Sequence, residues 1–211
     1  MAKSVIIGGA DGPTSVCLIK KNPKLTFCQK LQRCRYRIKR HCIEKTIRAN
    51  NHSIDEVMDY VVNVHGFVEV DSEDIFQEYN EMRASFIMQY ASELLGEYAT
   101  IEPLKSESPE DIQAHVNQFR DRQQRAKEIS KEKFDIDFHK FQKPCKDIND
   151  NMYIIVEKRF AYIGGGVSGD KKTTKKFQRI YKDVHRYYGV SNKDIENKTK
   201  RYEQVIRALT H

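Results

Sequence analysis

The chain has 211 residues, of which 37 are Lys or Arg and 30 are Asp or Glu, and its hydrophobic content is 39%. This composition favours a helix-rich, strongly solvated protein with one large domain or two small ones. No apolar run approaches the roughly 20 residues of a spanning helix, which excludes a membrane-embedded fold.

The charge is divided into three segments. Residues 1–48 hold 12 Lys/Arg against 2 Asp/Glu, residues 49–115 hold 2 against 15, and residues 116–211 hold 23 against 13. One interpretation is that the acidic middle packs beside the basic flanks and neutralises them. The other is that the charged surfaces bind partners, and the charge pattern is compatible with both.

Cysteine usage and the first residues indicate a cytoplasmic protein. The five cysteines are an odd number without paired spacing, and Met1-Ala-Lys is not followed by the apolar segment of a secretory signal. We therefore expect reduced thiols. Since Cys34 and Cys42 fall on an apolar helical stripe, we expect core thiols rather than a zinc site.

Hydrophobic periodicity predicts the elements of the first half of the chain. Two short apolar arms, 5–7 and 16–19, flank a glycine turn and predict a β-hairpin. A strongly basic helix follows over 25–49, with its main apolar stripe at Leu31, Cys34, Ile38 and Cys42 and a weaker one at Tyr36, Ile43 and Ile47. The later elements that we expect are a helix over 54–64, a strand over 67–70 pairing with the hairpin, and a helix over 72–95.

The second half begins after a predicted linker at 100–108. Its expected elements are a mostly polar helix over 108–133, a strand or irregular aromatic segment over 134–143, a strand over 152–163, a glycine loop over 164–173, and helices over 174–188 and 191–209. These elements predict an α+β fold, predominantly α-helical, with a small sheet from the N-terminal hairpin and the 152–163 strand. We expect two regions, 1–99 and 109–211, which can pack as one domain.

Residues 4–16 read Ser-Val-Ile-Ile-Gly-Gly-Ala-Asp-Gly-Pro-Thr-Ser-Val. They resemble the Gly-Gly-Ala-Asp-Gly-Pro-Thr motif of the membrane β subunit of sodium-pumping decarboxylases. The resemblance implies that Asp11 is part of an ion site. It covers about a dozen residues, and the rest of the chain lacks the apolar spanning helices of that family. The pump function is therefore not carried over.

Residues 184–201 resemble a helix-turn-helix unit. Val184, Gly189 and Ile195 match its hydrophobic and turn positions, whereas His185 replaces the usual small residue. The recognition face that this resemblance implies comprises Asn192, Lys193, Asn197, Lys198 and Arg201.

The glycine segment 164–169 follows a strand and precedes a basic helix, which is the context of a phosphate-binding turn. Asp170, however, stands where a P-loop has Lys, so we expect no nucleotide hydrolysis. No grouping of nucleophile, base and acid is evident, and we expect no enzymatic activity, no metal and no cofactor.

The leading hypothesis is a non-catalytic protein that binds nucleic acid or a nucleoprotein complex through basic surfaces. The residues expected to contact phosphates are Arg33, Arg35, Arg37, Lys39, Arg40, Lys171, Lys172, Lys175, Lys176, Lys193 and Arg201. An alternative is an acidic mimic of nucleic acid, such as a phage-encoded anti-defence inhibitor, that occupies a basic protein partner. Its surface would comprise Asp55, Glu56, Asp59, Glu73, Asp74, Glu78 and Glu81. A third hypothesis is an ion- or anion-binding module that uses Asp11 and the glycine turns.

Overall fold

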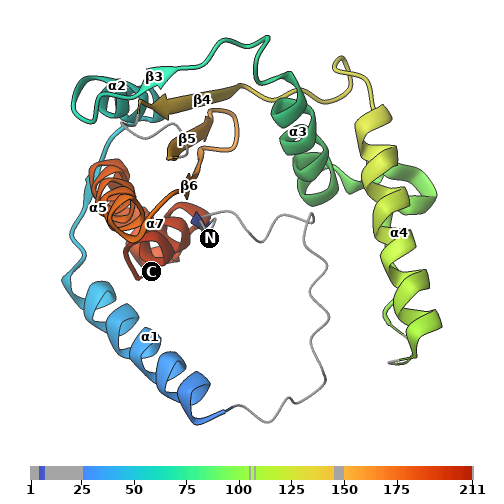
Figure 1. Cartoon of the computed structure of the whole chain (residues 1–211), viewed down its shortest axis with the longest axis horizontal. Helices are drawn as coiled ribbons and strands as arrows, with labels where there is room; N and C mark the ends of the chain where they lie inside the picture. The colour runs from blue at the N-terminus through green and yellow to red at the C-terminus, as the bar shows by residue number, and fades with distance from the viewer. Residues whose placement is uncertain (1–4, 8–25, 105, 107, 145–149, 211) are drawn as a thin grey trace. The chain divides into compact units, whose positions relative to one another are not determined.

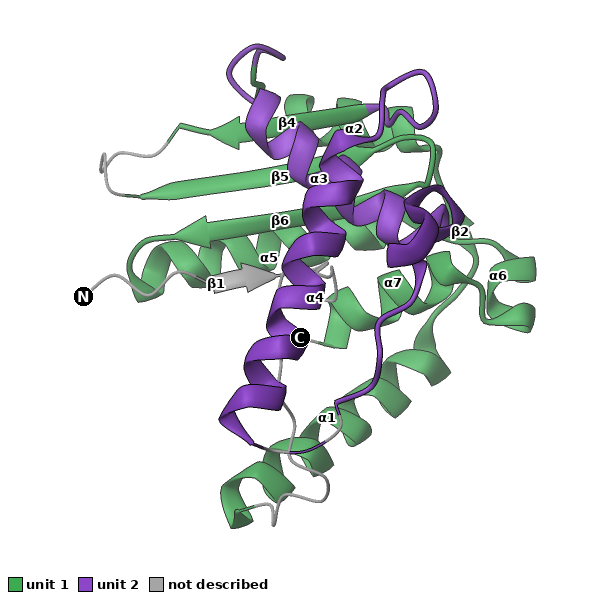
Figure 2. Cartoon of the chain, turned by 90° about the vertical axis from the view of Figure 1, so that its right-hand side faces the viewer, with its two compact units in different colours: residues 1–9, 19–70, 138–211 green, residues 10–18, 71–137 purple. Residues whose placement is uncertain are grey.

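The chain forms two compact units. The computed structural model describes residues 5–7, 26–104, 106, 108–144 and 150–210 (Figure 1). Unit 1 comprises residues 1–9, 19–70 and 138–211, and unit 2 comprises residues 10–18 and 71–137 (Figure 2). The fold is α+β and mostly helical, as predicted. The predicted linker at 100–108 lies inside unit 2.

Unit 1 combines a small sheet with helices. Its described elements are β1 Val5–Ile7, α1 Phe27–Thr46, β2 Asn50–Asn51, α2 Ile54–Asn63, β3 Val68–Glu69, β4 Phe138–Lys143, β5 Asn151–Glu157, β6 Tyr162–Ser168, α5 Lys171–Tyr188, β7 Gly189–Val190, α6 Asn192–Asn197 and α7 Lys200–Thr210. Five strands form an antiparallel sheet in the order β1-β6-β5-β4-β3, and β2 pairs separately with β7.

The sheet confirms some predicted pairings and corrects others. β1 pairs with β6, Ile7 opposite Gly165, so the N-terminal segment and the 152–163 region do share a sheet. The predicted second hairpin arm at 16–19 lies outside the described residues. The strand expected at 67–70 was predicted to pair with the hairpin. That prediction is wrong, because β3 pairs with β4 at the opposite edge.

The region predicted as one strand over 152–163 is a hairpin of β5 and β6. The buried carboxylate of Glu157 makes the turn possible, because it accepts hydrogen bonds from the backbone N–H groups of Arg159 and Phe160 at 3.2 and 2.6 Å. The segment 158–161 therefore reverses the chain where the sequence pattern predicts continuous strand.

The glycines at 164–166 lie within β6, so the predicted glycine loop is wrong at these positions. A Cβ on Gly165 would lie 3.0 Å from the ring of Phe177, and one on Gly166 would lie 2.6 Å from the ring of Tyr153. The glycines therefore allow aromatic rings to approach the backbone of β6 closely.

Helices α2, α5 and α7 supply the core of unit 1. Alternate residues of β5, Met152, Ile154 and Val156, are buried in one cluster with apolar side chains of these helices. Period-2 burial along β5 and period-3.6 burial along α5 are the patterns that a sheet covered by helices produces. This burial pattern fixes the rotation of α5, an 18-residue helix, about its helix axis.

Helix α1 packs with the face opposite to the predicted one. Ile43 and Ile47 pack against the core of unit 1. Leu31, Cys34 and Ile38 are exposed, and no residue of α1 is fully buried. The prediction that the stripe of Leu31, Cys34, Ile38 and Cys42 faces the core is therefore wrong. Cys28, Cys34 and Cys42 are exposed free thiols, not core thiols.

Unit 2 contains α3 Phe76–Tyr90, the 3₁₀ segment η1 Ser92–Ala99 and α4 Pro109–Glu128. The helix predicted to continue to residue 95 ends earlier, and Gly96 with φ 60° lies inside η1. Arg83 is buried and donates to the backbone carbonyls of Phe134, at 2.8 Å, and Ile129. This guanidinium connects α3 to the segment after α4, since buried carbonyls need donors.

Among the described residues, no helix combines the length and the apolar character that crossing a bilayer requires.

We predict that Gly189→Ala destabilises unit 1 by more than about 2 kcal/mol, because the backbone strain of a positive φ costs about 1–3 kcal/mol before any clash. Gly189 has φ 58°, and an added Cβ would lie 1.4 Å from the carbonyl oxygen of Asn50 across the β2–β7 pair. Urea unfolding followed by circular dichroism measures the loss.

Gly96→Ala is the matched control. Gly96 has φ 60° but no atom within 4 Å of the added Cβ, so only strain of about 1–2 kcal/mol is expected. Equal losses in the two variants would contradict the steric role that we assign to the β2–β7 pair.

Candidate nucleic-acid interface

Helix α5 separates apolar from basic side chains along its whole length. It begins at Lys171, where the carboxylate of Asp170 accepts a hydrogen bond from the backbone N–H of Thr173 at 2.6 Å. Phe177, Tyr181, Val184 and Tyr188 are buried against the sheet. The aromatic residues Tyr181 and Tyr188 are therefore core residues.

The opposite face of α5 carries a row of cations that we call the α5 row. Its members are separated by 4, 4, 3 and 4 residues, so that they fall on one side of the helix, and they are Lys171, Lys175, Arg179, Lys182 and Arg186. At a rise of 1.5 Å per residue, the row is about 22 Å long. Lys182 is half-buried and the other members are exposed. In the described part of the chain, none of them pairs with a carboxylate.

Helix α1 adds a sixth cation beside this row. Burial and the neighbouring ammonium of Lys182 lower the pKa of Lys39, and the Lys39 ammonium donates to the backbone carbonyl of Thr210. Two cations in proximity without a carboxylate between them create a positive potential that favours an anion.

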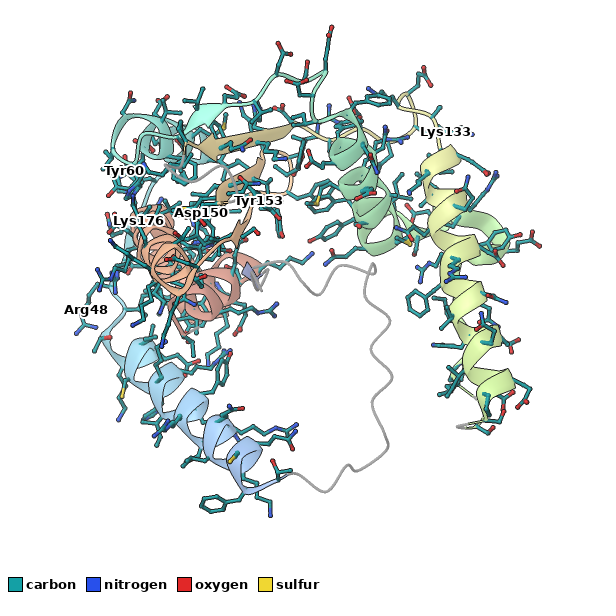
Figure 3. All side chains as sticks on the ribbon, viewed as in Figure 1. Arg48, Tyr60, Lys133, Asp150, Tyr153 and Lys176 are labelled. Atoms are coloured by element: carbon teal, nitrogen blue, oxygen red, sulfur yellow. The ribbon has the colours of Figure 1, made fainter. Side chains whose placement is uncertain are left out.

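A cleft of about 330 Å³ lies at the C-terminal end of the row, with Arg186 and Arg48 among its lining residues. Ile43, Ile47 and Val205 supply its apolar lining. Figure 3 shows Arg48 where α1 ends, and Lys176 on α5, toward the N-terminal end of that helix.

The remaining predicted α1 residues differ in their availability. Arg33, Arg35 and Arg37 are exposed. Arg40 is half-buried, and its guanidinium contacts the carboxylates of Glu44 and Glu203 at 2.8 Å each, which raises the pKa of Arg40. Arg40 therefore fastens α1 to α7, which corrects its prediction as an available phosphate contact.

The N-terminal end of α5 is already occupied by carboxylates. Lys171, Lys172, Lys175 and Lys176 are exposed there, as their predicted role requires. Asp170 caps the helix, and Asp150 accepts a hydrogen bond from the Thr173 hydroxyl at 2.6 Å. Two carboxylates at this helix end disfavour a phosphate, and no glycine loop precedes it. Residues 164–166 lie in β6 and therefore do not form the phosphate-binding turn expected there, so the anion site at 164–169 stays a prediction.

The helix-turn-helix resemblance holds only in part. The predicted second helix at 191–209 is two helices, because Lys198 adopts the left-handed conformation with φ 46° between α6 and α7. The turn residues Gly189 and Val190 pair with β2 rather than forming a free turn. His185 is fully buried, and Lys193 is exposed on α6.

Arg201 does not belong to an exposed recognition face, and this prediction is wrong. Its guanidinium lies 3.8 Å from the ring centroid of Tyr188 and donates to the carbonyls of Gly189 and His52 at 2.9 and 2.8 Å. These contacts join α7 to β7 and to the residue that follows β2. Arg201 is therefore a structural residue.

The predicted acidic surface is divided between the two units. Asp55, Glu56 and Asp59 lie on α2 in unit 1, whereas Glu73, Asp74, Glu78 and Glu81 lie in unit 2. Two of the three in unit 1 have structural partners. Asp55 pairs with Lys158 at 2.6 Å, and the carboxylate of Glu56 accepts from the backbone N–H of Ser53 at 2.6 Å. All three residues are exposed on α2, so in unit 1 the acidic surface is limited to this short stretch and two of its carboxylates already have partners.

Asp11, the predicted ion ligand, lies outside the described residues. Within the residues that are described, no three His, Cys, Asp or Glu side chains gather as a metal site would require.

A polar and aromatic cluster that the sequence pattern does not predict joins α5 to α2 and its flanking residues. The ring of Tyr187 stacks between Tyr60 and His52, with centroid distances of 4.0 and 3.9 Å. Asp183 accepts from the Tyr60 hydroxyl at 2.8 Å, and the ring Nε2 of His65 lies 3.2 Å from the same oxygen. Burial lowers the pKa of His65, and the hydrogen bond to Asp183 raises that of Tyr60. These contacts span more than 100 residues, and no local spacing predicts them.

A scan against protein-family models and searches of curated proteins and of solved structures found no match.

We predict that unit 1 loses stability as the pH falls from about 6.5 to 4. Burial lowers the pKa of His185 to about 4, and its Nδ1–H donates to the Tyr181 carbonyl at 2.9 Å. Because the unfolded chain has the ordinary pKa near 6.5, it binds more protons than the folded chain in this window, and the loss reaches about 3 kcal/mol. Urea unfolding at several pH values measures it.

His185→Leu should flatten the pH dependence of stability across that window, and His41→Gln, on the exposed surface of α1, should leave it unchanged. An unaltered pH profile in His185→Leu would contradict the assignment.

Proposed function

We propose that this chain is a non-catalytic protein that binds nucleic acid, alone or in a nucleoprotein complex, through the α5 row. The observation that carries the proposal is five cations on one helical face over about 22 Å, none of which pairs with a carboxylate in the described part of the chain. Evenly spaced cations on a rigid helix suit a polyanion of regular charge spacing.

The composition of the row favours contacts to the phosphate backbone. Three of its members are lysines, whose ammonium groups act as point charges, and two are arginines, whose planar guanidinium groups hold phosphate oxygens in pairs. Such contacts fix position and carry no sequence information. Binding is therefore proposed to be independent of base sequence.

Lys39 and Arg48 extend the same surface from α1. Lys39 lies beside Lys182, and Arg48 lines the cleft that also includes Arg186. Lys172 and Lys176 flank the row on α5. We propose the cytoplasm as the location of binding, since a reducing compartment keeps the exposed Cys28, Cys34 and Cys42 as free thiols.

The proposal predicts that Lys175→Gln and Arg179→Gln each weaken binding to a fluorescein-labelled duplex two- to five-fold at low salt. An exposed ion pair contributes about 0.2–1 kcal/mol, which sets this range. Fluorescence anisotropy with two duplexes of unrelated sequence measures the affinities, and the loss should be the same for both.

Lys127→Gln is the matched control, since Lys127 is an exposed cation on α4 of unit 2 and should not affect affinity. A loss in the control equal to that in the α5 variants would overturn the assignment to this face. So would wild-type affinity in both α5 variants.

A further inference from the structure

The outward face of α1 carries an apolar stripe that unit 1 does not use. We call Phe27, Leu31, Cys34 and Ile38 the outer stripe. Phe27 is 80% exposed, Leu31 43% and Ile38 59%, and Cys34 is exposed as well. Exposed large apolar side chains that adjoin one another mark an interaction surface more often than isolated ones do.

The opposite face of α1 holds the helix to unit 1. Ile43 and Ile47 pack against the core, and Arg40 pairs with Glu203 of α7. At 100° per residue, Tyr36 and Ile43 lie about half a turn from the outer stripe. The stripe therefore faces away from the body of unit 1, and in Figure 1 the N-terminal half of α1 extends away from α5 and α7.

The outer stripe has the spacing of a coiled-coil seam. Its members are separated by 4, 3 and 4 residues, which places Leu31 and Ile38 at heptad position a and Phe27 and Cys34 at position d. On that face of residues 27–38, the positions beside a and d are basic except for Cys28 at position e. A seam of this width suits one neighbouring helix rather than a broad surface.

The positions that flank the seam are basic on both sides. Lys30 and Arg37 occupy position g, and Arg35 occupies position e. No acidic residue precedes Glu44 in α1. Charges at e and g select the partner of a coiled coil, so two copies of α1 would repel one another while an acidic helix would be attracted.

We propose that the outward face of α1 is one half of a heteromeric coiled coil and binds a helix of a partner protein with apolar a and d positions and Glu or Asp at e and g. This surface is separate from the α5 row and its binding of nucleic acid. A phosphate backbone is charged and would not bury the apolar side chains of Phe27, Leu31 and Ile38. An interfacial helix on lipid is expected to bury a wider apolar face than two positions in seven.

The test uses the full chain and two synthetic three-heptad peptides with Leu at a and d. One peptide has Glu at every e and g position and the other has Lys. Fluorescence anisotropy should show saturable binding of the Glu peptide and at least ten-fold weaker binding of the Lys peptide. Leu31→Gln with Ile38→Gln should abolish binding of the Glu peptide. Circular dichroism should show an unchanged fold, because both side chains are exposed.

Reversing the charges at positions e and g tests the choice of partner more directly than removing the apolar side chains does. The triple variant Lys30→Glu, Arg35→Glu, Arg37→Glu should reverse the preference and bind the Lys peptide. Arg33→Glu, at position c outside the seam, should keep the wild-type preference. A triple variant that still prefers the Glu peptide would overturn the proposal.

Two other outcomes would also overturn it. Binding to vesicles of anionic phospholipid, with no binding of the Glu peptide, would assign the stripe to a lipid surface. A wild-type dimer in sedimentation equilibrium that is lost in the Leu31→Gln, Ile38→Gln variant would assign it to a second copy of this chain. Failure of this proposal leaves the α5 variants and their loss of duplex affinity unaffected.

Discussion

The approach of the Phe177 ring to the backbone of β6 is the contact on which the functional surface of unit 1 depends. A Cβ on Gly165 would lie 3.0 Å from that ring and 2.7 Å from the carbonyl oxygen of Tyr153, so only glycine allows α5 to lie this close to the sheet. With Phe177, Tyr181 and Val184 buried, the rotation of α5 is fixed. The same packing turns the five cations of the α5 row to the opposite side, where four are exposed and Lys182 is half-buried.

The two ends of α5 are stabilised by different means. Asp170 caps the N-terminal end, and Gly189 with φ 58° ends the helix and begins the strand that pairs with β2. Arg201 contacts the Tyr188 ring and donates to the carbonyls of Gly189 and His52. Its guanidinium is therefore engaged within the fold and does not add to the basic surface. Cations on this chain therefore divide into structural and available ones. Arg40 and Arg201 belong to the first group, and the α5 row to the second.

Sequence reasoning captured what short-range physics determines. The α+β class, the capping box of Ser53 with Glu56, and the start of α4 at Ser108-Pro109 were all predictable, because caps and periodicity act within one helical turn. The α5 row was also visible in the sequence, since its spacing follows from the residue numbers, although the phosphate contacts predicted on α5 ended at Lys176.

What sequence reasoning could not determine depends on distant contacts. The apolar stripe of α1 that faces solvent is the stronger of its two stripes, and only the position of α7 decides which one packs. Three consecutive glycines at 164–166 predict a loop from sequence alone. In the structure they are strand residues, and the rings of Phe177 and Tyr153 lie where side chains would be. The turn at 158–161 depends on a buried carboxylate, Glu157, that accepts from its backbone. In each case a tertiary partner overrides the local pattern.

The most direct test of the central claim is the salt dependence of duplex binding by the wild-type chain. If the five cations of the α5 row neutralise five phosphates, the logarithm of the association constant falls with the logarithm of salt concentration with a slope of about −4.5. A slope near this value establishes that phosphate neutralisation holds the complex. A slope near zero, or no binding at low salt, contradicts the account.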